Sequence, residues 1–472
     1  MMAHDFDIAV IGAGSGGLTV AAAAAQFGQR VVLFEKGEMG GDCLNTGCVP
    51  SKALLAAAKA AQAHRTSAQF GVAPDDPQID FAKAMAHVES VIAAIAPLDS
   101  QERFEGLGVT VVRAPVRFKG VNALEAKGKV FGARRFVIAT GSRAGVPPIP
   151  GINDVPFFTN ETIFKNRTLP KHLIIIGGGP IGLEMALAHR RLGAEVTVLE
   201  ASHPLAKDDP ELAKVVLDSL EAEGIKIRSG IKIERIEKTR SGIRIIAAEN
   251  EIIEGSHLLV AAGRVANVEG LHLETAGIDY TKRGITVDQG LRSVSNKRVY
   301  AAGDVAGGLQ FTHVAGYHAG LIIRNALFRL PVKNRTDIIP WVTYTDPELA
   351  HVGLTEKDAK AQHGDSIRVL RWHFHENDRA IAEGKAKGLV KLVTAKNGRI
   401  LGCSIVGPNA GDLIAMWTLA ITQKLKVSAI AGMVLPYPTF GEAGKRAAVT
   451  YYTGVTEKPL IRKLIGFLKN FG

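Results

Sequence analysis

Cysteine is scarce in this chain: Cys43, Cys48 and Cys403 are the only three in 472 residues. A stapled framework therefore cannot hold the fold together, and a close cysteine pair in a reducing compartment is more often catalytic or metal-binding. The N-terminus lacks the basic start, long apolar core and cleavage site of a signal peptide. No window of about 18 uncharged apolar residues is present either. These absences predict a cytoplasmic protein without a membrane-spanning helix.

The charge balance is basic, with 57 Lys and Arg against 46 Asp and Glu, a formal net charge of +11. Such a charge can attract an acidic partner, but no basic cluster interleaved with aromatic residues indicates nucleic acid. A bound dinucleotide would offset part of it. The length is enough for about two to four domains, and a hydrophobic content of 46% is enough for several cores.

A dinucleotide-binding pattern opens the chain. Residues 6–11, FDIAVI, predict a buried strand, an alanine-rich helix is predicted from Leu18, and residues 30–35, RVVLFE, predict a second strand that ends at Glu35. Three glycines of the intervening turn fit G-x-G-x-x-G: Gly12, Gly14 and Gly17. The first allows a tight turn, the second lets a pyrophosphate approach the backbone, and the third packs the helix against the strand. A carboxylate at the end of the second strand can accept both hydroxyls of a ribose.

The same pattern recurs 165 residues later in the sequence. The second set, in HLIIIGGGPIG and EVTVLE, is Gly177, Gly179, Gly182 and Glu200. One such turn is a weak signal, but two copies in one register predict two bound dinucleotides. Since neither second strand is followed directly by an arginine that would grip a 2′-phosphate, we expect NADH rather than NADPH on the second copy. His203 and Lys207 lie close enough in sequence to keep NADPH open.

Cys43 and Cys48 lie in the segment GGDCLNTGCVPSK, and a disulfide between them would close a loop of six residues. So short a loop leaves little room to relax, so we expect such a bond to be reduced more readily than a structural bridge. The segment SKALLAAAKAAQ predicts a helix at this point. Its dipole and Lys52 would lower the pKa of a thiol below the free value of about 8.5.

A metal site is the alternative interpretation of the pair. Cys-x4-Cys can be half of such a site, but no second Cys or His pair with ligand spacing accompanies it. His373 and His375 alternate along a predicted strand and are more simply surface residues. Cys403, in ILGCSIVG, is expected to be a small core residue. We therefore assign no metal ligands.

Together these segments resemble the flavin-dependent pyridine nucleotide-disulfide oxidoreductases, the family of dihydrolipoamide dehydrogenase, glutathione reductase and mercuric reductase. GGDCLNTGCVPSK is similar to the redox-active segment, FVIATGSR to the second flavin contact and GGGPIGLE to the nicotinamide-nucleotide turn. VAAGR and VYAAGDV resemble the closing flavin-domain segments, and VTYTDPELAHVGLTE resembles the start of the dimerisation domain. The resemblance implies an α/β fold with two Rossmann-like dinucleotide-binding domains and a C-terminal α+β dimerisation domain.

The expected domain boundaries follow from these matches. We expect a discontinuous FAD-binding domain at residues 1–150 and 271–335, and an NAD(P)-binding domain at 151–270. An interface domain is expected at 336–472, in which residues 387–407, KGLVKLVTAKNGRILGCSIVG, alternate as antiparallel strands.

The family implies FAD on the first unit and NAD(P)H on the second. Carried over by position, Cys48 would touch the flavin and Cys43 would exchange with substrate, while Lys52 would lie near the flavin and pair with Glu184. The implied FAD contacts are Gly12, Gly14, Gly17, Glu35, Lys52, Thr140, Gly141, Ser142, Gly303 and Asp304. The implied NAD(P) contacts are Gly177, Gly179, Gly182, Glu200 and Gly263.

One position departs from the family. Members that act on small disulfides carry His-Pro-Thr-x-x-Glu near the C-terminus, where the histidine is an acid/base supplied across the dimer. The matching stretch here is PYPTFGE, with Tyr437 at the histidine position and Glu442 still present. Deprotonating tyrosine rather than histidine at neutral pH costs roughly 4.8 kcal/mol more, and the nearby Glu442 would raise that cost. We therefore expect Tyr437 to be a poor general base.

Mercuric reductases also carry a tyrosine in this segment, but they add a pair of cysteines at the C-terminus, and this chain ends in LIGFLKNFG. The leading hypothesis is a homodimeric, dihydrolipoamide dehydrogenase-like enzyme in which Tyr437 reaches the partner's Cys43. The alternatives are a mercuric reductase-like metal-ion reductase, an NADH:quinone-type reductase, and a flavoprotein sensor of NADH with little turnover.

The C-terminal tail is amphipathic. After Pro459, one side of a helical wheel collects Leu460, Ile461, Leu464, Ile465, Leu468 and Phe471, and the other collects Arg462, Lys463 and Lys469. Packing on the protein's own surface or on the dimer partner is one explanation, and docking on anionic lipid is the other. A lipid-docked enzyme would make a quinone an available acceptor.

Overall fold

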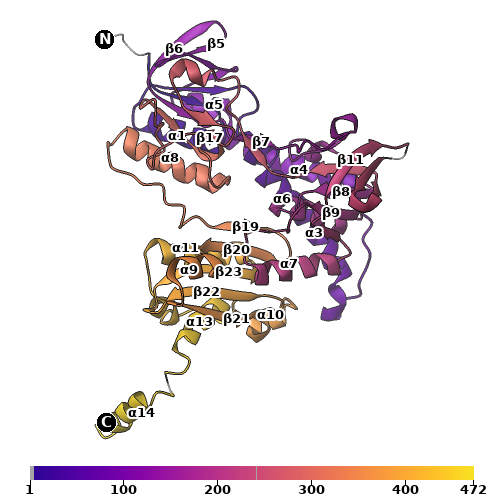
Figure 1. Ribbon diagram of the computed structural model, residues 1–472, viewed down its shortest axis with the longest axis vertical. Helices are drawn as coiled ribbons and strands as arrows, with labels where there is room; N and C mark the ends of the chain where they lie inside the picture. Colours follow the sequence, from indigo (N-terminus) through magenta and orange to yellow (C-terminus); the bar gives the residue numbers. More distant parts are fainter. Residues whose placement is uncertain (1–4, 241, 456, 472) are drawn as a thin grey trace. The chain divides into compact units, whose positions relative to one another are not determined.

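The computed structural model describes residues 5–240, 242–455 and 457–471. The chain forms two compact units (Figure 1). The first unit comprises Met1–Pro204 and Gly224–Thr336, and the second comprises Leu205–Glu223 and Asp337–Gly472. The finer division into FAD-binding, NAD(P)-binding and interface domains stays a prediction.

The first unit begins with a mixed sheet, in which some neighbouring strands are parallel and others antiparallel. Its strands are β1 (Phe6–Ile11), β2 (Val31–Glu35), β3 (Val109–Arg113), β4 (Arg117–Gly120), β5 (Ala123–Ala126), β6 (Lys129–Ile138) and β18 (Val299–Ala301). Their order is β3-β2-β1-β6-β5-β4, with β18 also paired to β6. β1, β2, β3, β6 and β18 pair in parallel, whereas β4, β5 and β6 form an antiparallel meander. Parallel strands need long crossovers, which cover both faces of the sheet.

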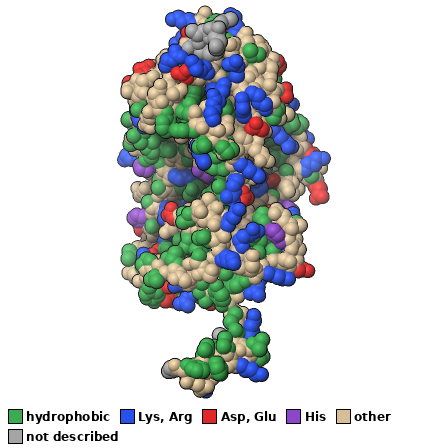
Figure 2. Space-filling view, turned by 90° about the vertical axis from the view of Figure 1, so that its left-hand side faces the viewer, with side chains coloured by type: hydrophobic (Ala, Val, Ile, Leu, Met, Phe, Trp, Pro, Cys, Tyr) green, Lys and Arg blue, Asp and Glu red, His purple; other side chains and the backbone are tan. Residues whose placement is uncertain are grey.

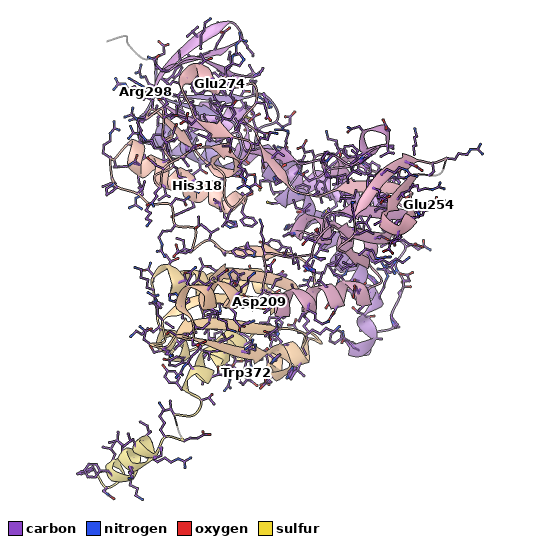
Figure 3. All side chains as sticks on the ribbon, viewed as in Figure 1. Asp209, Glu254, Glu274, Arg298, His318 and Trp372 are labelled. Carbon is purple, nitrogen blue, oxygen red and sulfur yellow. The ribbon has the colours of Figure 1, made fainter. Side chains whose placement is uncertain are left out.

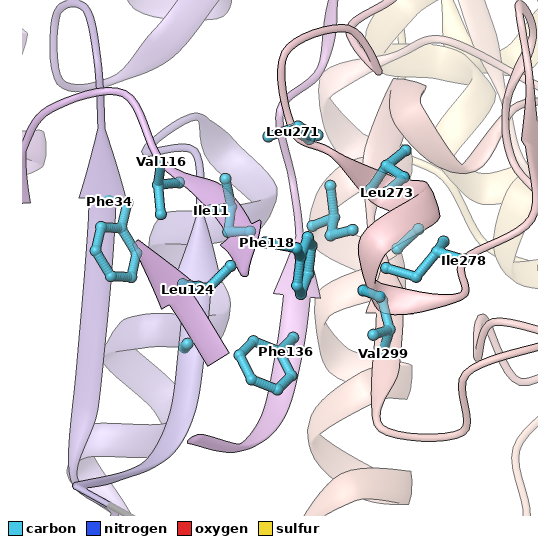
Figure 4. Close-up of a cluster of buried hydrophobic side chains, with 14 of the residues drawn as sticks. Ile11, Phe34, Val116, Phe118, Leu124, Phe136, Leu271, Leu273, Ile278 and Val299 are labelled. Carbon is cyan, nitrogen blue, oxygen red and sulfur yellow. The ribbon is translucent and has the colours of Figure 1, made fainter. Parts of the chain in front are cut away.

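Because both faces of the sheet are covered, β1 carries apolar side chains on both faces. Val10 packs in a cluster with the helices α1 (Ser15–Gln26) and α8 (Thr312–Ala326). Ile11, on the opposite face, packs in a second cluster with Phe136 (Figure 4). Both clusters bury the strand, so its carboxyl end, where the glycine turn begins, is held rigidly.

The second dinucleotide unit repeats this arrangement. Its parallel sheet has the order β10-β9-β8-β14, and α6 (Pro180–Arg191) connects β8 to β9. The strands are β8 (His172–Ile176), β9 (Glu195–Glu200), β10 (Lys226–Ser229) and β14 (His257–Val260). An antiparallel sheet of β11 (Ile233–Lys238), β12 (Ile243–Ala247) and β13 (Ile252–Gly255) accompanies it. The predicted pair of Rossmann-like units is confirmed.

The second compact unit, Leu205–Glu223 with Asp337–Gly472, is built on an antiparallel sheet in the order β19-β20-β23-β22-β21. The strands are β19 (Trp341–Thr343), β20 (Glu348–Gly353), β21 (Ile367–His373), β22 (Leu389–Ala395) and β23 (Ile400–Gly407). Its helices are α7 (Pro210–Ala222), α9 (Glu356–His363), α10 (Asp378–Ala382), α11 (Ala410–Thr422), α12 (Val427–Ala431), α13 (Gly441–Val449) and α14 (Pro459–Leu468). The fully buried Trp417 anchors the core. The expected α+β dimerisation domain, with β22 and β23 antiparallel, is confirmed.

A buried lysine ties α7 to this sheet. Lys391 on β22 is 5% exposed, and its Nζ lies 2.7 Å from Asp209 Oδ2, 2.9 Å from Glu211 Oε2 and 2.7 Å from Glu356 Oε2. Asp209, labelled in Figure 3, caps the N-terminus of α7 by accepting from the backbone N–H of Glu211. A buried cation of this kind needs carboxylate partners, so the ion cluster fixes where α7 packs.

Three local expectations differ from the structure. The first helix begins at Ser15 rather than Leu18, because the glycine turn leads directly into it from an extended Gly14. The strand β21 ends at His373, and the buried Phe374 turns the chain so that His375 lies on a 3₁₀ turn. The C-terminal helix ends at Leu468, so Phe471 lies beyond it.

One helical stretch of the described chain, Phe81–Gly106, has the length and hydropathy of a membrane span. It consists of α4 (Phe81–Ile95), a 3₁₀ turn (Ala96–Asp99) and α5 (Gln101–Gly106) rather than one continuous helix. Length and composition alone are weak support for a span.

Candidate active site

The cysteine pair lies on two short consecutive helical segments. Cys43 is on α2 (Gly41–Asn45), and Cys48 is the first residue of α3 (Cys48–Arg65). The two thiols are close enough for each to shift the pKa of the other. Cys48 Sγ also lies 3.3 Å from Thr312 Oγ1, at the start of α8. The structure therefore brings the two predicted redox residues together.

A close approach of two backbones positions this segment. Gly41 has a φ of +61°, and a Cβ at this position would lie 2.6 Å from the Cα of Gly14. Only glycine fits so tight a contact in this conformation. The N–H of Gly40 also donates to Ala13 O at 2.9 Å. The redox segment is thus fixed against the first glycine-rich turn.

The surroundings separate the pKa values of the two thiols. The hydrogen bond from Cys43 is the largest influence, and it lowers the pKa of Cys48 to about 6. Thr312 and the charge of Lys52 act in the same direction, while burial opposes them. The same hydrogen bond, together with burial, raises the pKa of Cys43 above its ordinary value. The predicted lowering of a thiol pKa is confirmed, with Cys43 rather than Lys52 as its main cause.

Lys52 lies one turn along α3 from Cys48. Its Nζ donates to Glu184 Oε2 at 2.7 Å, and the Glu184 side chain is only 6% exposed. Glu184 is on α6, the helix that follows the second glycine-rich turn. A charge-assisted hydrogen bond therefore joins the helix of the cysteines to the helix of the second dinucleotide unit.

Arg264, which the sequence did not single out, joins two parts of the site. It begins β15 (Arg264–Ala266), which pairs with β7 (Ser142–Ala144). Its Nη2 lies 2.9 Å from Asp42 Oδ2, next to Cys43, and its Nε lies 3.6 Å from Asp304 Oδ2. The Nε also donates to Ser142 Oγ at 2.7 Å, and that hydroxyl donates to Asp304. The Arg264 side chain is 13% exposed, so these interactions lie largely out of water.

Asp42 is held from its other side as well. Its Oδ1 accepts from Thr46 Oγ1 at 2.7 Å and from Asn160 Nδ2 at 3.1 Å. Its negative charge raises the pKa of both cysteine thiols. Arg264 therefore neutralises the carboxylate that opposes thiolate formation.

Glu35 at the end of β2 and Glu200 at the end of β9 accept equivalent hydrogen bonds. Glu35 Oε2 accepts from the N–H of Ala13 at 2.7 Å, and Glu200 Oε2 accepts from the N–H of Gly178 at 2.7 Å. Ala13 and Gly178 follow the first glycine of each turn, so the sequence repeat is also a repeat of hydrogen bonds. Carboxylate oxygens carry further lone pairs, which leaves acceptors for ribose hydroxyls.

The glycines of both turns have the geometry that a dinucleotide needs. A Cβ on Gly17 would lie 1.9 Å from Gly12 O, and one on Gly182 would lie 2.0 Å from Gly177 O. The helix therefore packs closely on the turn. A Cβ on Gly179 would meet nothing within 4 Å. That open position, beside the N-terminus of α6, is where a pyrophosphate would approach, so these residues fit the cofactors of such sites.

The other residues predicted to contact the cofactors follow the carboxyl ends of parallel strands. Thr140, Gly141 and Ser142 come after β6, Gly303 and Asp304 come after β18, and Gly263 comes after β14. Ligands of open α/β sheets bind outside these strand ends. Thr140 Oγ1 donates to Asn267 O at 2.7 Å, the N–H of Gly303 donates to His318 Nδ1 at 3.2 Å, and burial raises the pKa of Asp304.

Tyr437 lies in the second unit and is 69% exposed. Its hydroxyl donates to Asp378 Oδ2 at 2.7 Å. This hydrogen bond is the main reason that the pKa of Tyr437 is raised, and the charge of Glu442 on α13 contributes least. The expected increase is confirmed, but the sequence missed Asp378, the residue chiefly responsible.

The three residues that the sequence analysis rejected as metal ligands, His373, His375 and Cys403, lie in ordinary surface or core positions. The rings of His373 and His375 stack at 5.0 Å, and His375 is 65% exposed. Cys403 is buried at 1% exposure, as predicted. Across the described ranges, no three His, Cys, Asp or Glu side chains are grouped to hold a metal ion. His203 and Lys207 are exposed.

Two family models cover most of the chain. The pyridine nucleotide-disulphide oxidoreductase family matches residues 6–319, and its dimerisation domain matches residues 339–448. The chain therefore belongs to the pyridine nucleotide-disulphide oxidoreductases. These are FAD-dependent enzymes that act on sulfur groups with NAD(P)H, which confirms the predicted family and enzyme class. The dimerisation domain supports a homodimer.

Individual relatives carry different names. Dihydrolipoyl dehydrogenase of Thermus scotoductus is 36% identical over 465 residues, covering 94% of this chain and 96% of the relative. Mercuric reductase of Lysinibacillus sphaericus is 33% identical over 452 residues, covering 95% and 83%. The structure of the HOCl-induced flavoprotein disulfide reductase RclA from Escherichia coli matches with a TM-score of 0.84 and 27% identity, covering 94% and 99%. Similarity thus sets the class of enzyme and not its substrate.

Proposed function

We propose that this chain is an NADH-preferring flavoprotein that passes two electrons through Cys43 and Cys48 to or from a disulfide or dithiol substrate, as a dihydrolipoamide dehydrogenase does. The observation that carries the proposal is the pair itself: Cys43 and Cys48 lie on the adjoining helices α2 and α3, Cys48 Sγ lies 3.3 Å from Thr312 Oγ1, and Cys43 lowers the pKa of Cys48. Scarce cysteine elsewhere favours action in the cytoplasm.

The residues that would hold FAD are Gly12, Gly14, Gly17, Glu35, Lys52, Thr140, Gly141, Ser142, Gly303 and Asp304. Those that would hold the nicotinamide nucleotide are Gly177, Gly179, Gly182, Glu200 and Gly263. When bound, FAD supplies the two-electron carrier between the nicotinamide nucleotide and the cysteine pair. The Glu200 carboxylate supports NADH over NADPH, since it can accept from ribose hydroxyls and would repel a 2′-phosphate.

The two thiols would divide the sulfur chemistry. Cys43 attacks one substrate sulfur as its proton passes to the leaving sulfur, so that a mixed disulfide and one substrate thiol form. Cys48 Sγ⁻ then attacks Cys43 Sγ, forming the internal disulfide and releasing a second thiolate that is protonated by water. The cysteine pair loses two electrons and the substrate disulfide gains them. Lys52, held by Glu184, would keep the thiolate electrostatically favoured.

Tyr437 and Glu442 would complete the site from the other subunit. We propose that the working unit is a homodimer in which Tyr437 reaches the partner's Cys43. Tyr437 would act there as a hydrogen-bonding group rather than a base, and donating to that thiol would require its hydroxyl to leave Asp378. We also propose the three-domain division, with FAD bound by 1–150 and 271–335, NAD(P) bound by 151–270 and the dimer contact in 336–472.

A metal-ion reductase is the second candidate. Relatives named mercuric reductase support it, as does a solved Cu(II) complex of RclA, and the Tyr437 position suits a reaction that needs no imidazole base. Against it, the residues that the structure describes include no group of three or more His, Cys, Asp or Glu side chains that could hold a metal ion. The dithiol reaction therefore leads, and an NADH:quinone-type reaction ranks below both.

An acceptor panel tests the proposal. Purified holoenzyme is given NADH or NADPH without air, and bleaching of flavin absorbance at about 450 nm reports reduction. Lipoamide, glutathione disulfide, Hg(II), a quinone and oxygen are then offered in turn. Turnover with lipoamide or another disulfide that disappears in Cys43→Ser supports the proposal. Fastest turnover of Hg(II) would favour the metal-ion reaction, and one flavin reduction that stalls with every acceptor would indicate a sensor.

A further inference from the structure

The helix α14 (Pro459–Leu468) is the feature that the proposed function does not use. None of its residues is buried. Six large apolar side chains in or just after it are half to four-fifths exposed: Leu460 80%, Leu464 51%, Ile465 60%, Phe467 60%, Leu468 53% and Phe471 72%. A soluble surface seldom keeps so contiguous an apolar face without a partner.

The apolar face extends past the end of the helix. The rings of Phe467 and Phe471 meet edge to face with centroids 5.0 Å apart, so the chain after Leu468 turns Phe471 back onto α14. At about 1.5 Å per residue, this helix of ten residues is roughly 15 Å long, half the thickness of a hydrocarbon core. Such a helix can lie on a bilayer but cannot cross one.

The charges of this segment have one sign. Lys458, Arg462, Lys463 and Lys469 are exposed, and no Asp or Glu occurs from 458 to 471. Figure 2 shows hydrophobic and basic side chains side by side on this helix. An apolar face bordered by lysine and arginine is the composition of helices that lie in the headgroup region of anionic membranes.

A second copy of the chain fits this helix less well. The matched dimerisation domain ends at residue 448, so α14 lies outside the matched domain. Pairing two identical α14 helices would bring lysines and arginines of the same sign together, which costs free energy. An anionic surface gains free energy from each of those charges instead.

We propose that α14 docks this flavoprotein on an anionic lipid surface, with its apolar face in the boundary between headgroups and acyl chains. The proposal is independent of the electron acceptor. Docking would nevertheless hold the enzyme beside lipid-soluble or membrane-bound substrates.

Vesicle sedimentation of the full-length holoenzyme tests the proposal. Vesicles of phosphatidylglycerol and phosphatidylcholine are compared with vesicles of phosphatidylcholine alone, and flavin absorbance in the pellet reports bound protein. We expect binding to the anionic vesicles that weakens as salt is raised. Equal binding to both vesicle types, or binding that survives deletion of residues 459–472, would overturn the proposal.

Variants separate the two parts of the interaction. The double change Lys463→Gln with Lys469→Gln should weaken binding about 30-fold, since each charge contributes roughly a factor of five. Leu464→Ser with Phe467→Ser should lower binding at every salt concentration, while Ile252→Ser, which changes an equally exposed apolar residue elsewhere, should not. If the α14 variants instead reduce the oligomer size and the wild type ignores vesicles, the face belongs to a second copy and lipid docking is wrong. Flavin reduction by NADH in each variant reports the oxidoreductase function separately.

Discussion

The hydroxyl of Tyr437 donates its hydrogen bond to Asp378 Oδ2, and not to Glu442, the acid that the family motif places near it. A carboxylate acceptor stabilises the protonated phenol, so the pKa of Tyr437 lies above its ordinary value of 10. The residue at the histidine position of the family is therefore held as a donor.

Replacing Tyr437 with histidine should supply the missing base. We expect Tyr437→His to raise lipoamide turnover tens-fold or more, the range of positioned general acid–base catalysis, because Asp378 or Glu442 can orient a protonated imidazole. Steady-state kinetics with NADH and lipoamide measure the gain. Tyr437→Phe is the matched control and should change turnover little, since the phenol is not a base. Absence of a gain in the histidine variant would mean that residue 437 does not occupy the base position.

The two cysteines should differ in spectroscopy. Cys48→Ser is expected to abolish the long-wavelength charge-transfer absorbance of the NADH-reduced enzyme, because that band needs a thiolate against the flavin. Cys43→Ser should lose turnover with disulfides but keep the band, provided that the pH is high enough to hold Cys48 as a thiolate after its pKa has moved toward 9.0. A band that survives in Cys48→Ser would reject the assignment of the two roles.

The pH dependence of Cys48 follows from the same hydrogen bond. A thiol with its pKa lowered to about 6 is mostly thiolate at pH 7 and loses that form as the pH falls through 6. Iodoacetamide alkylation of reduced Cys48 should therefore slow about tenfold for each unit below that pKa. Cys43→Ser removes the chief cause of the shift, so the pKa of Cys48 in that variant should move toward the ordinary value of 9.0. If Cys48 titrates identically in the wild type and in Cys43→Ser, Cys43 is not the cause of the lowered pKa.

The sequence alone predicted the site residues that belong to a repeated motif or to one short contiguous segment. Glu35 and Glu200 were predicted from their shared spacing, and Cys43, Cys48 and Lys52 from one short segment. The residues it missed, Thr312, Arg264 and Asp378, contact the predicted residues Cys48, Ser142 and Tyr437, which are distant along the chain. Their types are common on surfaces and follow no spacing rule, because folding alone brings them together. The substrate escapes prediction because relatives with the same family motifs carry different names, dihydrolipoyl dehydrogenase and mercuric reductase.

Arg264 should act on the cysteines through Asp42. Arg264→Met removes the positive charge from Asp42, whose carboxylate raises the pKa of both thiols. We expect the pKa of Cys48 to rise above about 6. Stability should also fall by about 2 kcal/mol through the loss of charge-assisted hydrogen bonds. Alkylation rate against pH measures the first effect and thermal unfolding the second.

Arg264→Lys is the matched variant for that experiment. A lysine keeps the charge beside Asp42 but cannot also reach Ser142 and Asp304 in a forked geometry. It should therefore restore most of the Cys48 titration while flavin is held less tightly. If Arg264→Met loses stability but leaves the titration unmoved, Arg264 is a structural residue only.

Lys391 should contribute strongly to the stability of the second unit. Lys391→Met leaves the carboxylates of Asp209, Glu211 and Glu356 together without their buried cation, and we expect a loss of about 3–5 kcal/mol, measured by thermal unfolding of the full chain. Lys360→Met removes an exposed cation from the same Glu356 and should cost less than about 1 kcal/mol. Equal losses in the two variants would contradict the role of burial.

The acid dependence of that difference gives a second readout. Lys360 and Lys391 lower the pKa of Glu356 to about 2, from an ordinary value of 4.5. A carboxylate whose pKa is lowered by folding stabilises the fold above its unfolded value and loses that contribution as the pH falls through the folded one. The gap in stability between wild type and Lys391→Met should therefore be full above pH 5 and shrink toward pH 2. A gap that stays constant over this range would show that Lys391 acts through packing and not through its charge.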